Sequence, residues 1–104
     1  MGKVYFKNHL TEKGAMIAMC DAELLGKSFT EGKKELDLKK YADFYKGDLM
    51  DEKDAMKEVS SETIYTANIV GKRSVAAFVN GGFVTEADIM QIAKIPYVQL
   101  YKMI

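Results

Sequence analysis

The chain has 104 residues, which is the length of one domain. Fifteen Lys and Arg balance fifteen Asp and Glu, and 48% of the residues are hydrophobic, a composition that excludes a disordered tail. A single Cys and a single His exclude an internal disulfide, a four-Cys zinc site and a multi-histidine metal centre.

The longest apolar run covers only residues 15–20, far short of the roughly 18 residues that a membrane-spanning helix needs. The first residues lack the charged, apolar and small segments of a secretory leader. We therefore expect a cytoplasmic protein that makes no membrane contact, and we expect no cofactor and no metal.

The N-terminal part of the sequence predicts two strands joined by a hairpin. Residues 3–9 alternate, with Val4 on one face and Tyr5 on the other, as in a half-buried strand. Residues 15–20 are apolar at every position, which is typical of an interior strand covered on both faces. The polar residues 11–14 between them end in glycine, which favours a tight connection.

The middle of the chain predicts short elements. Asp21 can cap a single helical turn that Gly26 ends, because the carboxylate accepts backbone N–H groups and glycine tolerates the left-handed conformation. Residues 35–39 alternate with their charges outward, as in an edge strand. Residues 46–48 predict a turn, and residues 52–59 predict a largely solvated helix.

The C-terminal part predicts a strand, two helices and a closing strand. Residues 63–70 are rich in β-branched and aromatic side chains, which favours a strand. Residues 72–80 form the most apolar predicted helix, and residues 86–93 form a third helix capped by Thr85. A proline blocks further helix, and residues 97–103 predict the closing strand.

The order of these elements predicts an α+β (α/β) fold. We expect a single domain over residues 1–104. Its core would be a mixed β-sheet of about five strands with two to three helices packed on it.

The charges are distributed unevenly along the chain. Three Lys stand against seven acids in residues 43–62, whereas the segments before and after each carry a net charge of +2. This acidic segment is either a solvated helix face or a docking surface for a basic partner.

A candidate anion site lies between a predicted strand and a predicted helix, at Gly71, Lys72, Arg73 and Ser74. A helix start offers free N–H groups and the positive end of the dipole to an anion, and the two cations add charge. Nucleotide hydrolysis is not indicated, because the glycine spacing of a P-loop is missing. Asn68 either satisfies buried backbone groups or faces the same ligand. These five residues are the main candidates for an anion or ligand site, and the alternative is a helix start with solvated cations.

Cys20 and Asp21 end the predicted interior strand. A thiol near a helix start can be nucleophilic, which leaves open a small enzyme that uses Cys20 with His9 as its base. The alternatives are a small buried apolar role for Cys20 and a capping role for Asp21.

Tyr5, Tyr97 and Tyr101 could stack on bases beside nearby lysines, as in proteins that bind single-stranded RNA. Tyrosine is also common on sheet faces, so a structural role stays open. The weaker site candidates are Cys20, Asp21, Lys27, Tyr97 and Tyr101.

Several strings in the sequence resemble one protein family. They are Cys20-Asp21-x-Glu23-Leu24-Leu25-Gly26-Lys27-x-Phe29, Glu31-Gly32, Phe44-Tyr45-x-Gly47, Ala67-Asn68-x-Val70-Gly71 and Ile95-Pro96-x-x-Gln99. Together they span nearly the whole chain and are similar to a small archaeal family of uncharacterised proteins, domain of unknown function four-two-four. Tyr97 departs from the His-containing segment near the end of that family. The resemblance implies an archaeal cytoplasmic protein with an α/β fold, and it implies no activity.

Three functions remain open at this point. The first is a non-enzymatic binding module that contacts RNA or a ribonucleoprotein, in a translation-related role, through the helix start at Gly71. The second is a protein-interaction subunit or homodimer that uses the acidic segment, residues 43–62. The third is a small enzyme built on Cys20 or on the Gly71 anion site. A basic patch would favour the RNA-binding module, and an exposed apolar patch would favour the protein-interaction subunit. A deep pocket around Cys20 would favour the enzyme.

Overall fold

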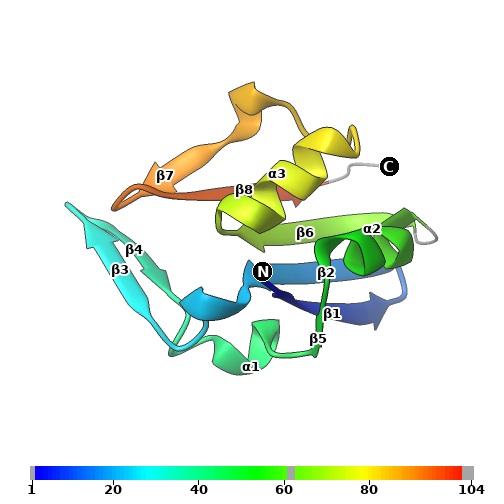
Figure 1. Cartoon of the computed structure of the whole chain (residues 1–104), viewed down its shortest axis with the longest axis horizontal. Coiled ribbons are helices and arrows are strands. Elements are labelled where there is room, and N and C mark those ends of the chain that lie inside the picture. The colour runs from blue at the N-terminus through cyan, green and yellow to red at the C-terminus, as the bar shows by residue number, and fades with distance from the viewer. Residues whose placement is uncertain (1, 61–62, 102–104) are drawn as a thin grey trace.

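The computed structural model describes residues 2–60 and 63–101. Within these residues the strands are β1 (Val4–Thr11), β2 (Gly14–Asp21), β3 (Ser28–Glu31), β4 (Lys34–Asp37), β5 (Asp48–Met50), β6 (Ile64–Val70), β7 (Met90–Ile92) and β8 (Ile95–Tyr101) (Figure 1). The helices are α1 (Ala42–Tyr45), α2 (Glu52–Ser60) and α3 (Lys72–Asn80), and the short 3-10 turns are η1 (Ala22–Leu24) and η2 (Glu86–Asp88).

One mixed sheet organises the fold. Its strands follow the order β5-β1-β2-β6-β8-β7. The central strands β2 and β6 run parallel, and the other neighbours are antiparallel. Because β2 and β6 are parallel, their carboxyl ends meet at the same edge of the sheet, with Cys20 opposite Val70.

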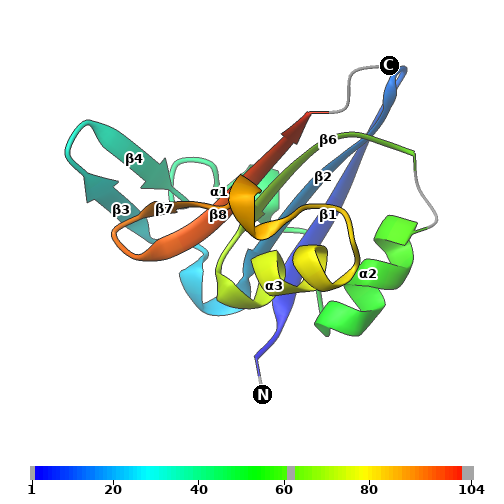
Figure 2. The same cartoon turned by 90° about the horizontal axis from the view of Figure 1, so that it is seen from above.

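Helices α2 and α3 cover one face of the sheet, where the larger core lies (Figure 2). Alternate residues of β2 point into this core, and Ile17 and Met19 are completely buried there. They pack in one cluster with Phe78 of α3 and Val59 of α2. The two helices are therefore fixed on the sheet by burial of their apolar stripes.

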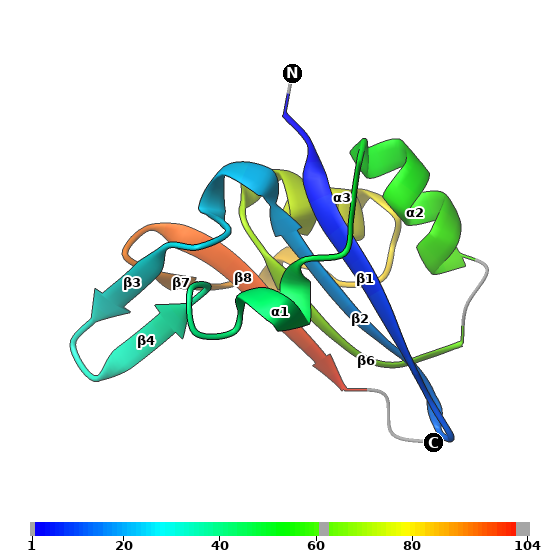
Figure 3. The ribbon, with the colours of Figure 1, turned by 90° about the horizontal axis from the view of Figure 1, so that it is seen from below.

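The opposite face of the sheet carries α1 and the hairpin β3–β4 (Figure 3). A smaller core cluster lies beneath them and includes Cys20, Leu38, Tyr45 and Val70. Both faces of the central strands are covered, which confirms that β2 is an interior strand.

The hairpin β3–β4 is a separate two-stranded sheet that projects from the body (Figure 1). The turn between β7 and β8 lies beside it, where the Ala93 N–H donates to Glu31 Oε1 at 3.0 Å.

The predicted third helix over residues 86–93 is wrong. Thr85 and Asp88 do form a capping box, but the turn that they cap is 3-10 and ends at Asp88. The following residues form β7, which pairs with β8. Ala93 and Lys94 then adopt left-handed φ values of 51° and 67°, which closes a tight hairpin turn. Pairing with β8 thus outweighs the helical spacing of the apolar residues.

Two further details differ from the prediction. The expected edge strand at residues 35–39 is β4 of the separate hairpin and not an edge of the main sheet. The predicted turn at residues 46–48 leads into the short strand β5, which pairs with β1 at that edge. The main sheet consequently has six strands among the described residues, where about five were expected.

The remaining elements confirm the α+β prediction. The N-terminal hairpin, α2, β6 and α3 lie where the sequence predicts them, within one or two residues. The closing strand begins at Ile95, slightly earlier than expected, and residues 102–103 of its predicted range lie outside the described residues.

Burial predicts opposite outcomes for two neighbouring substitutions in β2. Ile17 is fully buried, whereas Met16 points to the other face and is half-buried, less covered than the sequence suggests. An unpaired buried charge costs several kcal/mol out of a total stability of about 5–15 kcal/mol. We expect Ile17→Asp to lose its cooperative thermal transition and Met16→Asp to keep one, as measured by circular dichroism. A wild-type melting temperature for Ile17→Asp would contradict this placement.

Candidate functional site

The carboxylate of Asp21 closes the start of α3. This side chain lies at the end of β2 and is 3% exposed. Its Oδ2 accepts the Arg73 N–H at 3.0 Å, and its Oδ1 accepts the Ser74 N–H and the Ser74 hydroxyl, both at 2.8 Å. The negative charge therefore sits at the positive end of the helix dipole and satisfies two N–H groups of the first turn.

Gly71 allows this close approach. Its φ is 105°, in the region that favours glycine, and a Cβ at this position would collide with the Asp21 carboxylate. The Gly71 N–H donates to the Pro96 carbonyl at 2.8 Å, which ties the same corner to β8. The glycine is thus required by an internal contact.

The cations at this corner have internal partners as well. Arg73 Nη1 lies 3.2 Å from Glu23 Oε1 and 3.8 Å from Asp21 Oδ2. The pKa of Glu23 is lowered, mainly by a hydrogen bond with its own backbone and further by Arg73. Lys72 is exposed to solvent.

These contacts correct the prediction of an open anion site at Gly71, Lys72, Arg73 and Ser74. The N–H groups of Arg73 and Ser74 already hold an anion, which the chain itself supplies. The prediction that the Asp21 carboxylate caps the turn ending at Gly26 is wrong, because the carboxylate instead caps α3, which begins more than fifty residues further along the chain. Asp21 occupies the N-cap position of η1 without a side-chain hydrogen bond to that turn.

Cys20 does not have the surroundings of a nucleophile. It is completely buried, and burial together with the charges of Asp21 and Glu23 raises the pKa of its thiol to about 12. The thiol is therefore protonated at neutral pH, and only the thiolate is nucleophilic.

His9 is also too distant from Cys20 to act as its base. In the β1–β2 register, Cys20 lies opposite Tyr5, which is four residues from His9. At about 3.4 Å per residue, this register separates the two positions by roughly 14 Å along the strands. The imidazole instead stacks on Phe44, with ring centroids 4.8 Å apart.

Six lysines gather on the hairpin β3–β4 and beside it. Lys27, Lys39 and Lys40 flank its base, Lys33 and Lys34 lie at its tip, and Lys94 is in the adjacent β7–β8 turn; all six are exposed. Three acids share this region, Glu31, Glu35 and Asp37, so its net charge is +3. We call residues 27–40 together with Lys94 the basic arm. The weak candidate Lys27 belongs to it.

Asn68 does not join the group at Gly71. It points to the face that carries α1, where it lines two adjoining cavities of about 380 and 140 Å³. Tyr45 and Gln99 line both cavities with it, and we call this space the amide cleft. Tyr97 borders the smaller cavity, whereas Tyr101 is 67% exposed and lines neither.

Sequence reasoning missed Tyr45 and Gln99 as site residues. The signal for Gln99 lies in the pairing of β6 with β8, which places it directly opposite Asn68. Tyr45 belongs to a four-residue helix that the sequence leaves ambiguous.

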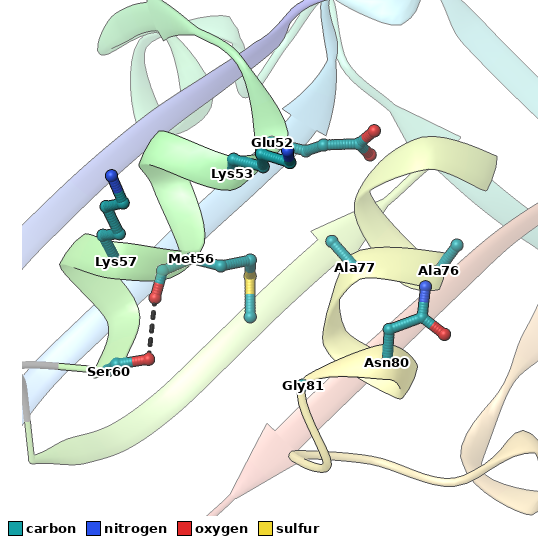
Figure 4. Close-up of a pocket in the computed structure, with 9 residues that line it drawn as sticks. All are labelled: Glu52, Lys53, Met56, Lys57, Ser60, Ala76, Ala77, Asn80 and Gly81. Atoms are coloured by element: carbon teal, nitrogen blue, oxygen red, sulfur yellow. Dashed lines mark hydrogen bonds between the residues drawn. The ribbon is translucent and has the colours of Figure 1, made fainter.

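A groove of about 720 Å³ lies between α2 and α3 on the other face of the sheet (Figure 4). Met56 points from α2 towards Ala77 of α3 (Figure 4), and Lys53 and Lys57 of α2 also line the groove. Among the described residues, no group of three His, Cys, Asp or Glu side chains is placed to bind a metal ion. No helix in this part of the chain has the length and apolar character needed to cross a bilayer.

The fold and these residues define a small α+β protein whose central helix is capped from a neighbouring strand. The model of the family described as "Protein of unknown function (DUF424)" matches residues 9–103, and the chain belongs to this family. The crystal structure of an uncharacterized conserved protein from Methanopyrus kandleri is similar, with a TM-score of 0.81 and 25% identity over 95% of this chain and 90% of that chain. No curated protein matches the sequence. The family resemblance read from the sequence is confirmed.

The buried thiol predicts how stability depends on pH in the alkaline range. Burial raises the folded-state pKa of Cys20 from 9.0 to about 12. The contribution of the protonated Cys20 thiol to the free energy of unfolding is therefore complete below pH 9 and is lost as the pH rises towards 12. We expect the unfolding free energy of the wild type to fall more steeply than that of Cys20→Ala, by up to about 1.4 kcal/mol per pH unit. Urea titrations between pH 8 and 11 measure both slopes, and equal slopes would contradict the buried, protonated thiol.

Proposed function

We propose that this protein is a non-enzymatic, cytoplasmic binding module that contacts single-stranded RNA, free or within a ribonucleoprotein, through the basic arm. The observation that carries this proposal is the concentration of six exposed lysines on a projecting hairpin and its neighbouring turn. A local basic patch binds the phosphate backbone by releasing counterions, even when the net charge of the protein is zero.

The internal partners of the acids in the arm support this proposal. Glu31 accepts the Ala93 N–H, and Asp37 accepts the N–H groups of Lys39 and Lys40 at 3.1 and 2.8 Å. These two carboxylates are directed to backbone groups. The ion pairs within the described residues involve Lys3 and Arg73 and no lysine of the arm. The lysine side chains are consequently available to phosphates.

Removal of two lysines at the tip of the arm tests the proposal. We expect Lys33→Ala/Lys34→Ala to weaken the binding of a single-stranded RNA oligonucleotide and to reduce the slope of log K against log salt by about 1.4, since each contact with single-stranded RNA contributes roughly 0.7. Fluorescence anisotropy over a salt series measures both quantities. The melting temperature should stay within a few degrees of wild type, because both side chains are exposed.

The matched control is Lys53→Ala/Lys57→Ala, which removes the same charge from exposed positions of α2. This variant should bind RNA as the wild type does. Equal losses in the two variants would show that only net charge matters, and no RNA binding by the wild type at about 0.1 M salt would refute the proposal.

A second candidate function is protein interaction, and the α2–α3 groove favours it. The acidic segment, residues 43–62, supplies α2, and its charge of −4 is complementary to the basic arm. A second copy of this chain therefore fits this surface best. Sedimentation velocity in low and high salt distinguishes a salt-sensitive homodimer from a monomer, and a monomer at all concentrations would exclude this function.

A further inference from the structure

The amide cleft has the size and position of a ligand site next to the basic arm. Its larger cavity, about 380 Å³, falls within the range of about 300–1,000 Å³ that is typical of small-molecule sites. Glu35, Leu36 and Asp37 of β4 line this cavity, so one wall of the cleft is a strand of the arm itself. The opposite wall is the sheet, at β6 and β8.

Three polar side chains face this space without internal partners. Asn68 and Gln99 lie directly opposite each other on β6 and β8, with Cβ atoms about 4.5–5.5 Å apart. Within the described residues, neither amide forms a hydrogen bond, and neither does the Tyr45 hydroxyl. Tyr45 is 8% exposed and yet lines both cavities. Asn68 is half-buried and Gln99 is exposed, so the polar groups that line the cleft are accessible from solvent and can bind a ligand that offers both donors and acceptors.

Aromatic rings form the mouth of the cleft. Tyr41 and Phe44 line the larger cavity, and Tyr41 is 55% exposed. The Lys40 ammonium lies 5.5 Å from the centroid of the Tyr41 ring. A planar heterocycle could stack on such a ring while its polar edge reaches the amides.

The charges at the cleft exclude a phosphate and favour a neutral ligand. Glu35 and Asp37 both line it, and the pKa of Asp37 is lowered, chiefly by the hydrogen bond from the Lys40 N–H. Two carboxylates repel an anion but accept hydrogen bonds from amino groups. The lysines that attract phosphate lie outside, on the arm.

We propose that the amide cleft receives one unstacked base of an RNA strand whose phosphates contact the basic arm. This inference rests on the proposed function and names the ligand of the adjoining surface. Asn68 and Gln99 read the polar edge of the base, since side-chain amides pair with base edges through one donor and one acceptor. The acceptors Glu35 and Asp37 select bases that carry an exocyclic amino group, so adenine and cytosine bind better than uracil.

Gln99→Ala tests the base contact, and Gln91→Ala is its matched control. Both glutamines are exposed on neighbouring strands, but Gln91 lies outside the cleft. We expect Gln99→Ala to weaken binding of an oligocytidine or oligoadenosine by at least about fivefold and to leave oligouridine binding nearly unchanged. Gln91→Ala should bind all three oligonucleotides as the wild type does. Tyr45→Phe, which removes a single hydroxyl, should resemble Gln99→Ala without a loss of melting temperature.

An oligonucleotide with abasic positions measures the phosphate contribution alone. The wild type should bind this abasic oligonucleotide more weakly than it binds oligocytidine. Gln99→Ala should bind the abasic oligonucleotide as tightly as the wild type does. If RNA binding depends on Lys33 and Lys34 but not on base identity or Gln99, the base site is refuted and the basic arm stands.

Free cytidine and adenosine, which lack phosphate, test the cleft independently of the arm. We expect either nucleoside to shift the side-chain NH₂ resonances of Asn68 and Gln99 in ¹⁵N-edited NMR spectra, and the Gln91 amide to stay unchanged. Such shifts without any RNA binding would retain the base site and refute the arm. Unchanged Asn68 and Gln99 resonances at millimolar nucleoside, with no base preference in RNA, would overturn the inference.

Discussion

The hydrogen bonds from the start of α3 to the Asp21 carboxylate are the constraint on which this fold depends. A buried charge is costly unless it is fully hydrogen-bonded, and here two backbone N–H groups and one hydroxyl satisfy it. Their geometry requires that the end of β2 lie beside the end of β6, which the parallel pairing of these strands provides. It also requires a glycine at position 71, where any side chain would displace the carboxylate. One contact thus fixes the central strand pair, the entry into α3 and the face that this helix covers.

The same contact changes where function has to be sought. A helix start with two adjacent cations is a common anion site, but its N–H groups are already bound and Arg73 faces two acids. Exposed cations are concentrated instead on the projecting hairpin. Polar side chains without internal partners line the amide cleft, and strand β4 of the hairpin forms one wall of this cleft. These two surfaces adjoin each other, because β4 of the hairpin lines the cleft. The hairpin and α1 lie on the opposite side of the sheet from α2 and α3 (Figures 2 and 3). They are the surfaces on which we base the functional proposals.

The sequence predicts the elements whose own residues determine them. The uniform apolar run of β2 and the apolar helix between Gly71 and Gly81 are clear in the chain, because burial on both faces leaves an unbroken apolar run and burial along one stripe leaves a helical period. β5 and β7 have three residues each, which is too short for a period-2 pattern, and pairing with neighbours decides them. The partner of Asp21 is more than fifty residues away in the chain, so local capping rules assign its side chain to η1. Likewise, Asn68 becomes part of a site only when strand register places Gln99 beside it.

Phosphate binding to the wild type and to Asp21→Gly tests the central claim most directly. If the carboxylate occupies the anion position of α3, its removal opens that position to an external anion. Phosphate stabilises folded proteins in general relative to chloride, and specific binding to the native state adds RT ln(1 + [L]/Kd). At constant ionic strength, phosphate should therefore raise the melting temperature of Asp21→Gly by more than that of the wild type. An equal rise in both proteins, or in neither, would contradict the assignment of Asp21 as the internal anion of this helix.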